Sequence, residues 1–476
     1  MRSTLFPRIL LALAAAALAF LVPELLKPGW GLVVLMVALV VLLLVLGVWA
    51  RAEKRLPFLC DPLVLVSVFQ AQFFVIGPLC LPFVQAQYTS LYTIPVERVV
   101  ATLALFLLLQ GSFIAGYQIR VGVALARVLP VFGPGRVKLP GRWIETLILV
   151  GSGLGCAGFV WNLGGLDYIL RLGYGQGRSS AFFLLAFHAL ILATLLMAWR
   201  LIQSGPARPG DRALFLAVLL FEVIFFALVL GARKRLFFLF FGLFAVWLLR
   251  FGKARMPRRA AIVALVALLA FFSFWGTVRS RSLRDLAEGR NREAGVPQQA
   301  AYMGYLTGVA EPFAVACKVV ELFPDTEPYR YGGTLLVTLL GFIPRAVWPE
   351  KPVGIGKELT KYTDGVYYDP YYGHSIATTL VGDAYANLGV IGVLLGGLGL
   401  GILCRTAAAY AAEGMVDGCQ SSPARVLVMA VFLASLVEVR GDMAGILAFH
   451  GMTYPFLLVA LLFFRLDYRR SVPVPA

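Results

Sequence analysis

Three adjacent cations, Arg233, Lys234 and Arg235, stand between two apolar stretches. Like charges repel one another, so this cluster gains most from a multivalent anion such as a diphosphate. Long basic side chains also anchor the ends of membrane helices without any ligand. We favour anion binding. The apolar stretches on either side predict membrane helices, and the three cations form the turn between them on the outer face of the membrane, where lysines and arginines are otherwise few.

A second group of chemistry-bearing side chains lies between residues 342 and 389, where aromatic rings stand next to charged groups. Rings can cover the C–H faces of a sugar, polar groups can bind its hydroxyls, and cations can bind phosphate. Tyrosine and tryptophan also collect at membrane interfaces, so composition leaves both interpretations open. The candidate binding residues here are Arg345, Trp348, Lys351, Tyr371 and Tyr372.

His374 and Asp383 are the candidates for a general base. Histidine titrates near neutral pH, which suits removal of a proton from a sugar hydroxyl. His188 and His450 fall inside apolar stretches, where a single histidine is more often a packed, hydrogen-bonded residue. Asp383 could be the base itself, orient the imidazole, or cap the helix that begins beside it. The sequence does not choose among these roles.

Two further positions combine charge with an unusual place in the chain. Arg440 and Asp442 flank Gly441 in a short turn, with Glu438 just before them, and either a local ion pair or substrate binding fits this pattern. Glu222 lies near the middle of an apolar stretch, where an ionisable residue is functional by default. A protonated Glu222 bonded to a neighbouring helix is the alternative.

We expect no metal and no cofactor. The six cysteines include no C-x-x-C pair, and with only three histidines no cluster has the spacing of zinc ligands. The glycine-rich runs 151–155 and 392–401 lie inside apolar stretches, and the second has the G-x-x-x-G spacing of close helix packing. We therefore interpret both as packing surfaces and not as nucleotide-binding loops.

The composition predicts that membrane helices carry these residues. The chain has 476 residues, of which 60% are hydrophobic and 14% charged, and its mean hydropathy is +0.84. A soluble domain is typically about 45–50% apolar and about 25% charged, so a soluble globule, a disordered chain and a coiled coil are excluded. Lipid offers no hydrogen bonds to the backbone, which predicts an all-α polytopic membrane protein.

Apolar runs of suitable length predict about twelve transmembrane helices. The first resembles a signal peptide but has no convincing cleavage site, so we expect it to be retained. The chain then divides into residues 1–277 with nine helices, residues 278–379 outside the membrane, and residues 380–476 with three helices. The predicted spans are 7–26, 31–50, 62–84, 98–119, 144–163, 181–202, 213–232, 236–250, 260–277, 380–403, 425–440 and 443–464.

The formal net charge of +17 has a topological explanation. Lysine and arginine concentrate in cytoplasmic loops, and most of those in the short loops fall on the side that holds the N-terminus. We therefore expect both termini in the cytoplasm and residues 278–379 in the periplasm. That segment contains an amphipathic helix over residues 302–323, a short apolar run at 333–343 that suits a re-entrant or buried helix, and a loop over residues 345–373.

The run GFIPRAVWPEKP at 341–352, followed by HSIATTLVGDAYANLG at 374–389, resembles the Wzy-type O-antigen (oligosaccharide repeat-unit) polymerases. The turn LGARKR at 230–235 resembles the Gly-x-Arg turn of that family and of the related O-antigen ligases. The resemblance implies a bacterial inner-membrane glycosyltransferase that moves a growing glycan from undecaprenyl diphosphate to the next lipid-linked repeat unit on the periplasmic face. It points, without assigning roles, to Arg233, Arg345, Trp348, Lys351, His374 and Asp383.

The partners that this resemblance implies are lipid-linked oligosaccharides and membrane lipid, with no nucleic acid, and binding of a chain-length co-polymerase stays open. The diphosphate is a ready leaving group, so such an enzyme needs cations for the developing charge and a base for the acceptor hydroxyl. Three alternatives stay open. They are a flippase of lipid-linked sugar, which Glu222 supports, a non-enzymatic scaffold of an envelope assembly, and ligation of the finished glycan to lipid A core.

Overall fold

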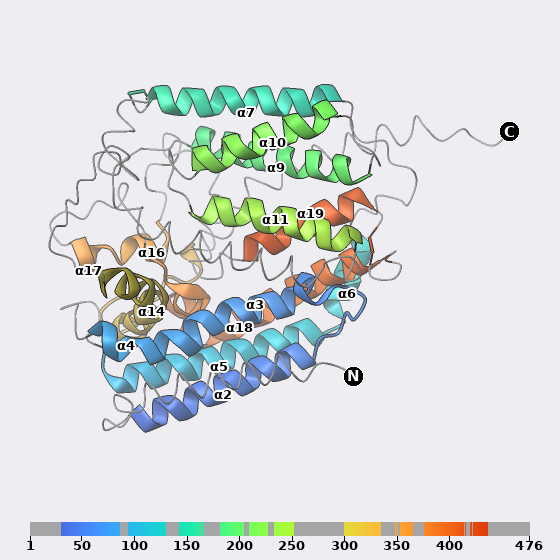
Figure 1. Ribbon diagram of the computed structural model, residues 1–476. Coiled ribbons are helices and arrows are strands. Elements are labelled where there is room, and N and C mark those ends of the chain that lie inside the picture. The colour runs from blue at the N-terminus through green and yellow to red at the C-terminus, as the bar shows by residue number, and fades with distance from the viewer. Residues whose placement is uncertain are drawn as a thin grey trace.

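All regular elements in the described part of the chain are helices (Figure 1). The computed structural model describes residues 30–85, 94–129, 142–162, 164–165, 181–203, 209–226, 233–251, 299–334, 348, 350, 353–364, 376–413, 415, 419–420 and 422–436. The predicted all-α fold is confirmed for these residues.

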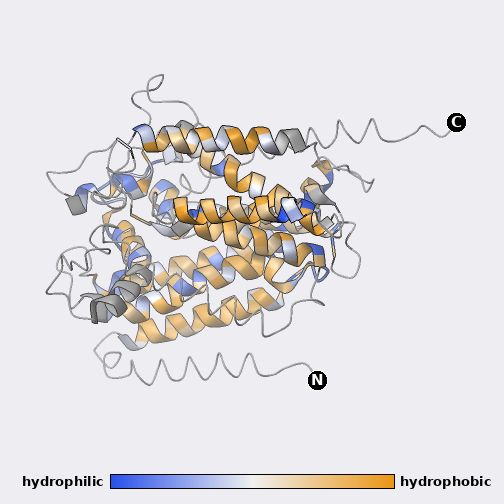
Figure 2. Ribbon diagram, turned by 45° about the horizontal axis from the view of Figure 1, so that its top comes forward, coloured by the Kyte–Doolittle hydropathy of each residue, from blue (hydrophilic) through white to orange (hydrophobic). Residues whose placement is uncertain are grey.

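Among the residues that the structure describes, four helical stretches are long and apolar enough to cross a membrane. They are α2 (Trp30–Trp49), the Pro62–Pro82 part of the continuous run α3 (Pro62–Ala71) to α4 (Gly77–Gln85), α5 (Val96–Gln118) and α18 (Thr379–Ala412). Figure 2 shows that apolar residues cover the helices and that polar residues gather toward their ends. Broad exposed apolar faces are stable against lipid rather than water, so the structure supports a membrane protein.

The other long helices also coincide with predicted spans, although their crossing of a membrane stays a prediction. They are α7 (Arg142–Asn162), α9 (Ala181–Gln203), α10 (Pro209–Ile224), α11 (Arg233–Phe251) and α19 (Pro423–Ser435). The predicted spans 7–26, 260–277 and 443–464 lie outside the described residues. The total of twelve transmembrane helices therefore stays a prediction.

The segment between α11 and α18 contains more helix than the sequence pattern predicted. A helix over 302–323 was expected, and α14 (Gln299–Leu322) is found there. It is buried nearly all round between Ala310 and Val320, because it packs against α4, α5 and α18. The prediction of loop over 345–373 is wrong in part, since the one-turn helices α16 (Ile355–Glu358) and α17 (Lys361–Asp364) form within it. The apolar run 333–343 is described only at its first two residues.

Glycines allow α5 and α18 to cross at close range. A Cβ atom added at Gly116 would lie 2.3 Å from the carbonyl oxygen of Leu398, and one at Gly401 would lie 2.2 Å from that of Phe113. Packing is therefore confirmed for the glycine-rich run of α18. In α7 it holds at Gly155, which faces Ala186 of α9, whereas Gly151 has open space around its Cβ position.

The described helices bring distant loops together at two opposite ends of the bundle. At one end, α14, α16 and α17 surround the starts of α5 and α18 (Figure 1). At the other end lie residues 51–61, α6 (Val121–Val128) and the start of α19, where the Gln420 N–H donates to the carbonyl of Leu249 at 2.8 Å. Asp383, the candidate site residue on α18, lies at the first of these ends.

We predict that Gly401→Ala lowers the stability of the folded protein by about 1–3 kcal/mol, the usual cost of overpacking. The added methyl group would meet backbone of α5, which cannot move aside as a side chain can. Thermal unfolding of the purified protein in detergent measures the effect. Gly399→Ala is the matched control, because its Cβ position is open and alanine favours a helix. Equal melting temperatures for the two variants would contradict the packing assignment.

Candidate functional site

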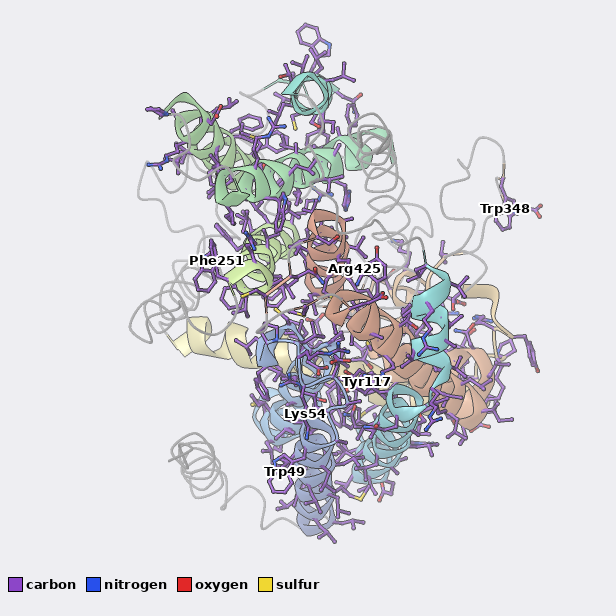
Figure 3. The ribbon with its side chains drawn as sticks, turned by 90° about the vertical axis from the view of Figure 1, so that its right-hand side faces the viewer. Trp49, Lys54, Tyr117, Phe251, Trp348 and Arg425 are labelled. Carbon is purple, nitrogen blue, oxygen red and sulfur yellow. The ribbon has the colours of Figure 1, made fainter. Side chains whose placement is uncertain are left out.

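The structure describes some of the predicted site residues and not others. Trp348 is half-buried and stands on a loop away from the main helices (Figure 3). Arg233 and Lys234 form the first residues of α11, and nothing is described of their side chains. The predicted residues outside the described part of the chain are Arg345, Lys351, Tyr371, Tyr372, His374 and Arg440.

Asp383 is fully buried, at 0% exposure, in the first part of α18. The Thr334 hydroxyl donates to its Oδ1 at 3.2 Å. The Asn387 side-chain N–H group donates to the backbone carbonyl of Asp383 at 2.7 Å and to the Thr334 oxygen at 2.6 Å. The cap position of α18 belongs to Thr378, so the capping role considered for Asp383 is wrong. Its carboxylate instead joins the 330–334 loop to α18.

The helix α18 breaks just beyond this group. Leu388 and Gly389 have non-helical backbone angles, and Gly389 takes φ +60° and ψ −141°, which only glycine adopts readily. A Cβ atom at Gly389 would also lie 2.8 Å from the Tyr329 hydroxyl oxygen. In membrane transporters, half-helices that meet at such a break commonly border a binding site.

The backbone of the 330–334 loop satisfies the carbonyls that the break releases. The Arg330 N–H donates to the carbonyl of Ala386 at 2.9 Å, and the Tyr331 N–H donates to that of Asn387 at 2.9 Å. Unpaired carbonyls would be costly in an apolar setting. The break in α18 is therefore stabilised by residues 330 and 331, which are distant in sequence.

Tyrosine and arginine side chains that the sequence analysis did not select surround the break. Tyr329 and Tyr385 pack edge to face, with ring centroids 6.0 Å apart. Arg98, at the start of α5, donates to the carbonyl of Val320 at 3.5 Å. These half-buried groups are of the kind that binds sugars and phosphates. Tyr385 lies inside the 374–389 motif and could have been selected, but only the fold brings Tyr329 and Arg98 to it.

An ion-pair cluster holds α16 and α17 onto this loop. Glu327 accepts hydrogen bonds from Lys361, from the Tyr362 hydroxyl at 2.6 Å and from Arg330 at 2.9 Å. Arg330 also bonds Glu358, with its Nε 3.0 Å from Oε2. Burial raises the pKa of Glu327, but the three hydrogen bonds outweigh that effect and lower the pKa to about 2. Glu327 is thus ionised at neutral pH.

Arg235 lies in another part of the bundle. Its guanidinium carbon is 4.6 Å from the ring centroid of Phe187 on α9, so the side chain turns toward the neighbouring helix. The helix α11 packs on α9 and α19, whereas α18 packs on α5 and α14. Arg235 and Asp383 therefore lie on helices that are joined mainly through α19, which packs on both. Within the described ranges, no three histidine, cysteine or carboxylate side chains are grouped to hold a metal ion.

Comparison of the chain with family models, with curated proteins and with solved structures finds no match. The resemblance of the three quoted motifs to the Wzy-type polymerases stays a hypothesis.

We predict that Glu327→Gln raises amide hydrogen exchange in residues 355–364 by about tenfold or more, since a hydrogen bond to a charged group contributes about 1.5–3 kcal/mol. Exchange measured by mass spectrometry at neutral pH tests this. Glu321→Gln, which removes an ion pair with Lys318 inside α14, should leave the segment unchanged. An unchanged segment in the Glu327 variant would show that the cluster does not hold it.

The same carboxylate predicts an acid dependence. The folded-state pKa of Glu327 is lowered to about 2, so its contribution to stability is complete above its ordinary pKa of 4.5 and is lost as the pH falls toward 2. Protease cleavage within residues 355–364 should increase in wild type over that range. In Glu327→Gln it should already be high at neutral pH and change less.

Proposed function

We propose that this protein polymerises lipid-linked oligosaccharide repeat units by glycosyl transfer, with undecaprenyl diphosphate as the leaving group. The active site would lie at the end of the bundle where α14, α16, α17 and the break in α18 meet, which is also the end where α11 begins (Figure 1). The observation that supports this place is that the motif at 374–389 ends at Gly389, near buried polar groups and half-buried aromatic and cationic groups. The apolar helices support a membrane location. The bacterial inner membrane, cytoplasmic termini and a periplasmic site are part of the proposal.

The chemistry needs one base and several cations. The acceptor hydroxyl oxygen attacks the anomeric carbon, the bond from that carbon to the diphosphate oxygen breaks, and the diphosphate leaves with the electron pair. The hydroxyl proton passes to the base. We assign Arg233, Lys234, Arg345 and Lys351 to the developing charge on the diphosphate.

The assignment of the base follows from burial. Asp383 is fully enclosed and bonded to Thr334. We therefore assign proton removal to His374, and we assign to Asp383 the positioning of the loop and of Asn387. Trp348, Tyr371 and Tyr372 would bind sugar rings, together with Tyr329 and Tyr385.

We predict that His374→Ala lowers polymerisation by about 10²–10⁴-fold, the usual contribution of a positioned base, while binding of the lipid-linked repeat unit is retained. Product ladders from purified protein in lipid give the rate. Asp383→Asn should lower turnover less and should raise hydrogen exchange in residues 329–334, a change that His374→Ala should not cause. A full ladder from the His374 variant would eliminate it as the base.

We predict that Arg233→Ala and Arg345→Ala each reduce turnover roughly ten- to a hundredfold, because each removes a charge-assisted hydrogen bond worth about 1.5–3 kcal/mol. Lysine at either position should restore only part of the activity, since it lacks the planar fork of arginine. The control is Arg127→Ala, an exposed arginine of α6 at the other end of the bundle. Unchanged ladders from both variants would contradict the diphosphate role.

A flippase is the second candidate, and the specific observation in its favour is the buried carboxyl group of Glu222. Translocation of labelled lipid-linked sugar across vesicles, with no polymer formed, would favour it over a polymerase. Transfer of the glycan only to lipid A core would favour a ligase.

A further inference from the structure

The helix α10 places its one mid-helix carboxyl group inside the bundle. Beyond its first turn the exposed side chains are apolar and include Leu216, Leu220 and Phe221, whereas Glu222 is 0% exposed. This is the reverse of a helix in water, because the leucines face outward and the glutamate faces its neighbours. In a membrane helix, a polar residue that faces the interior marks a functional site by default.

The surroundings of Glu222 are largely aromatic. Phe225 and Phe226 follow it in a π-helical turn and are both buried. Phe225 packs against Phe187 of α9 at 5.4 Å and Phe159 of α7 at 6.4 Å between ring centroids. Turns of π-helix occur often at functional sites, because they shift the register of the face that follows.

Polar and titratable groups approach from three neighbouring helices. Cys156 of α7 lies within electrostatic range of both Glu222 and Arg235 of α11. Thr194 approaches from α9, but its hydroxyl donates to the carbonyl of Leu190 at 3.3 Å. His188 is a titratable group that is also buried on α9. Neither carboxyl oxygen of Glu222 has a hydrogen-bond partner among the residues that the structure describes.

This environment favours one protonation state in the packed structure. An ionised carboxylate without donors in an apolar setting is very costly, so the group is held as the neutral acid. Removal of the proton requires water or a donor to reach the carboxylate. The helix α10 packs mainly on α9 and exposes its other faces, so a shift of α10 can open the site without unpacking the bundle.

We propose that Glu222 is a proton-binding site, which holds a proton while α10 is packed and exchanges it when α10 moves away from α9. The site is independent of the glycosyl-transfer chemistry. The competing role is a permanently neutral acid that only fills space. The two differ in one property, which is whether the group titrates in the folded protein.

Infrared difference spectroscopy of the full-length protein in lipid, stepped between acid and alkaline pH, tests the proposal. We expect the carbonyl band of a protonated carboxylic acid to disappear as the pH rises, and this change to be lost in Glu222→Gln. Glu311→Gln, on α14, should retain it. Glutamine has the shape of the neutral acid, so the variant should fold. Identical difference spectra for wild type and Glu222→Gln would overturn the proposal.

A second measurement needs no variant. A protonated carboxyl group in apolar surroundings adds its O–H across a C=N bond of dicyclohexylcarbodiimide. The resulting O-acylisourea rearranges to a stable N-acylurea, which mass spectrometry locates. Labelling of Glu222 that falls as the pH rises supports a titrating site. Labelling that is constant over the pH range, or absent at acid pH, overturns it.

Discussion

The break in α18 depends on hydrogen bonds from outside the helix. Where the helix is interrupted at Leu388 and Gly389, the carbonyls of Ala386 and Asn387 lose their helical donors, and lipid cannot replace them. The N–H groups of residues 330 and 331 supply these bonds. The Arg330 side chain in turn bonds Glu327 and Glu358. One loop therefore holds both α18 and the short helices α16 and α17.

The opposite end of the bundle is held by a buried charge. Asp61 caps α3 by accepting the Leu63 N–H at 3.1 Å, and it accepts the Tyr117 hydroxyl of α5 at 2.8 Å. Arg51 Nε lies 2.8 Å from its other oxygen, and Arg405 of α18 lies over the Tyr117 ring. Figure 3 shows Tyr117 at this end of the molecule. Loss of either partner would leave an uncompensated buried charge, so this cluster fixes how α3, α5 and α18 meet.

The two ends of the bundle differ in the groups that they present. Asp61 is fully buried and its oxygens are taken up by Arg51 and Tyr117, whereas the end near Gly389 combines half-buried tyrosines, Arg98 and a charged cluster. Sugars and phosphates bind to polar and aromatic groups that are partly accessible, as these are. The glycosyl-transfer proposal therefore relies on the Gly389 end, and the Glu222 proposal relies on a separate group of helices.

The apolar pattern of the sequence is enough to predict that the described chain is helical and where most helices lie, because lipid forces each spanning segment to satisfy its own backbone hydrogen bonds. Helix packing by Gly397 and Gly401 also followed from their spacing. Three further features depend on tertiary contacts: Asp383 is buried and is not a cap, α16 and α17 form within an apparent loop, and Tyr329 and Arg98 lie near Tyr385. The physical reason is that these outcomes rest on contacts such as Arg330 with Glu358 and Thr334 with Asp383, which join residues far apart in the chain and leave no local pattern.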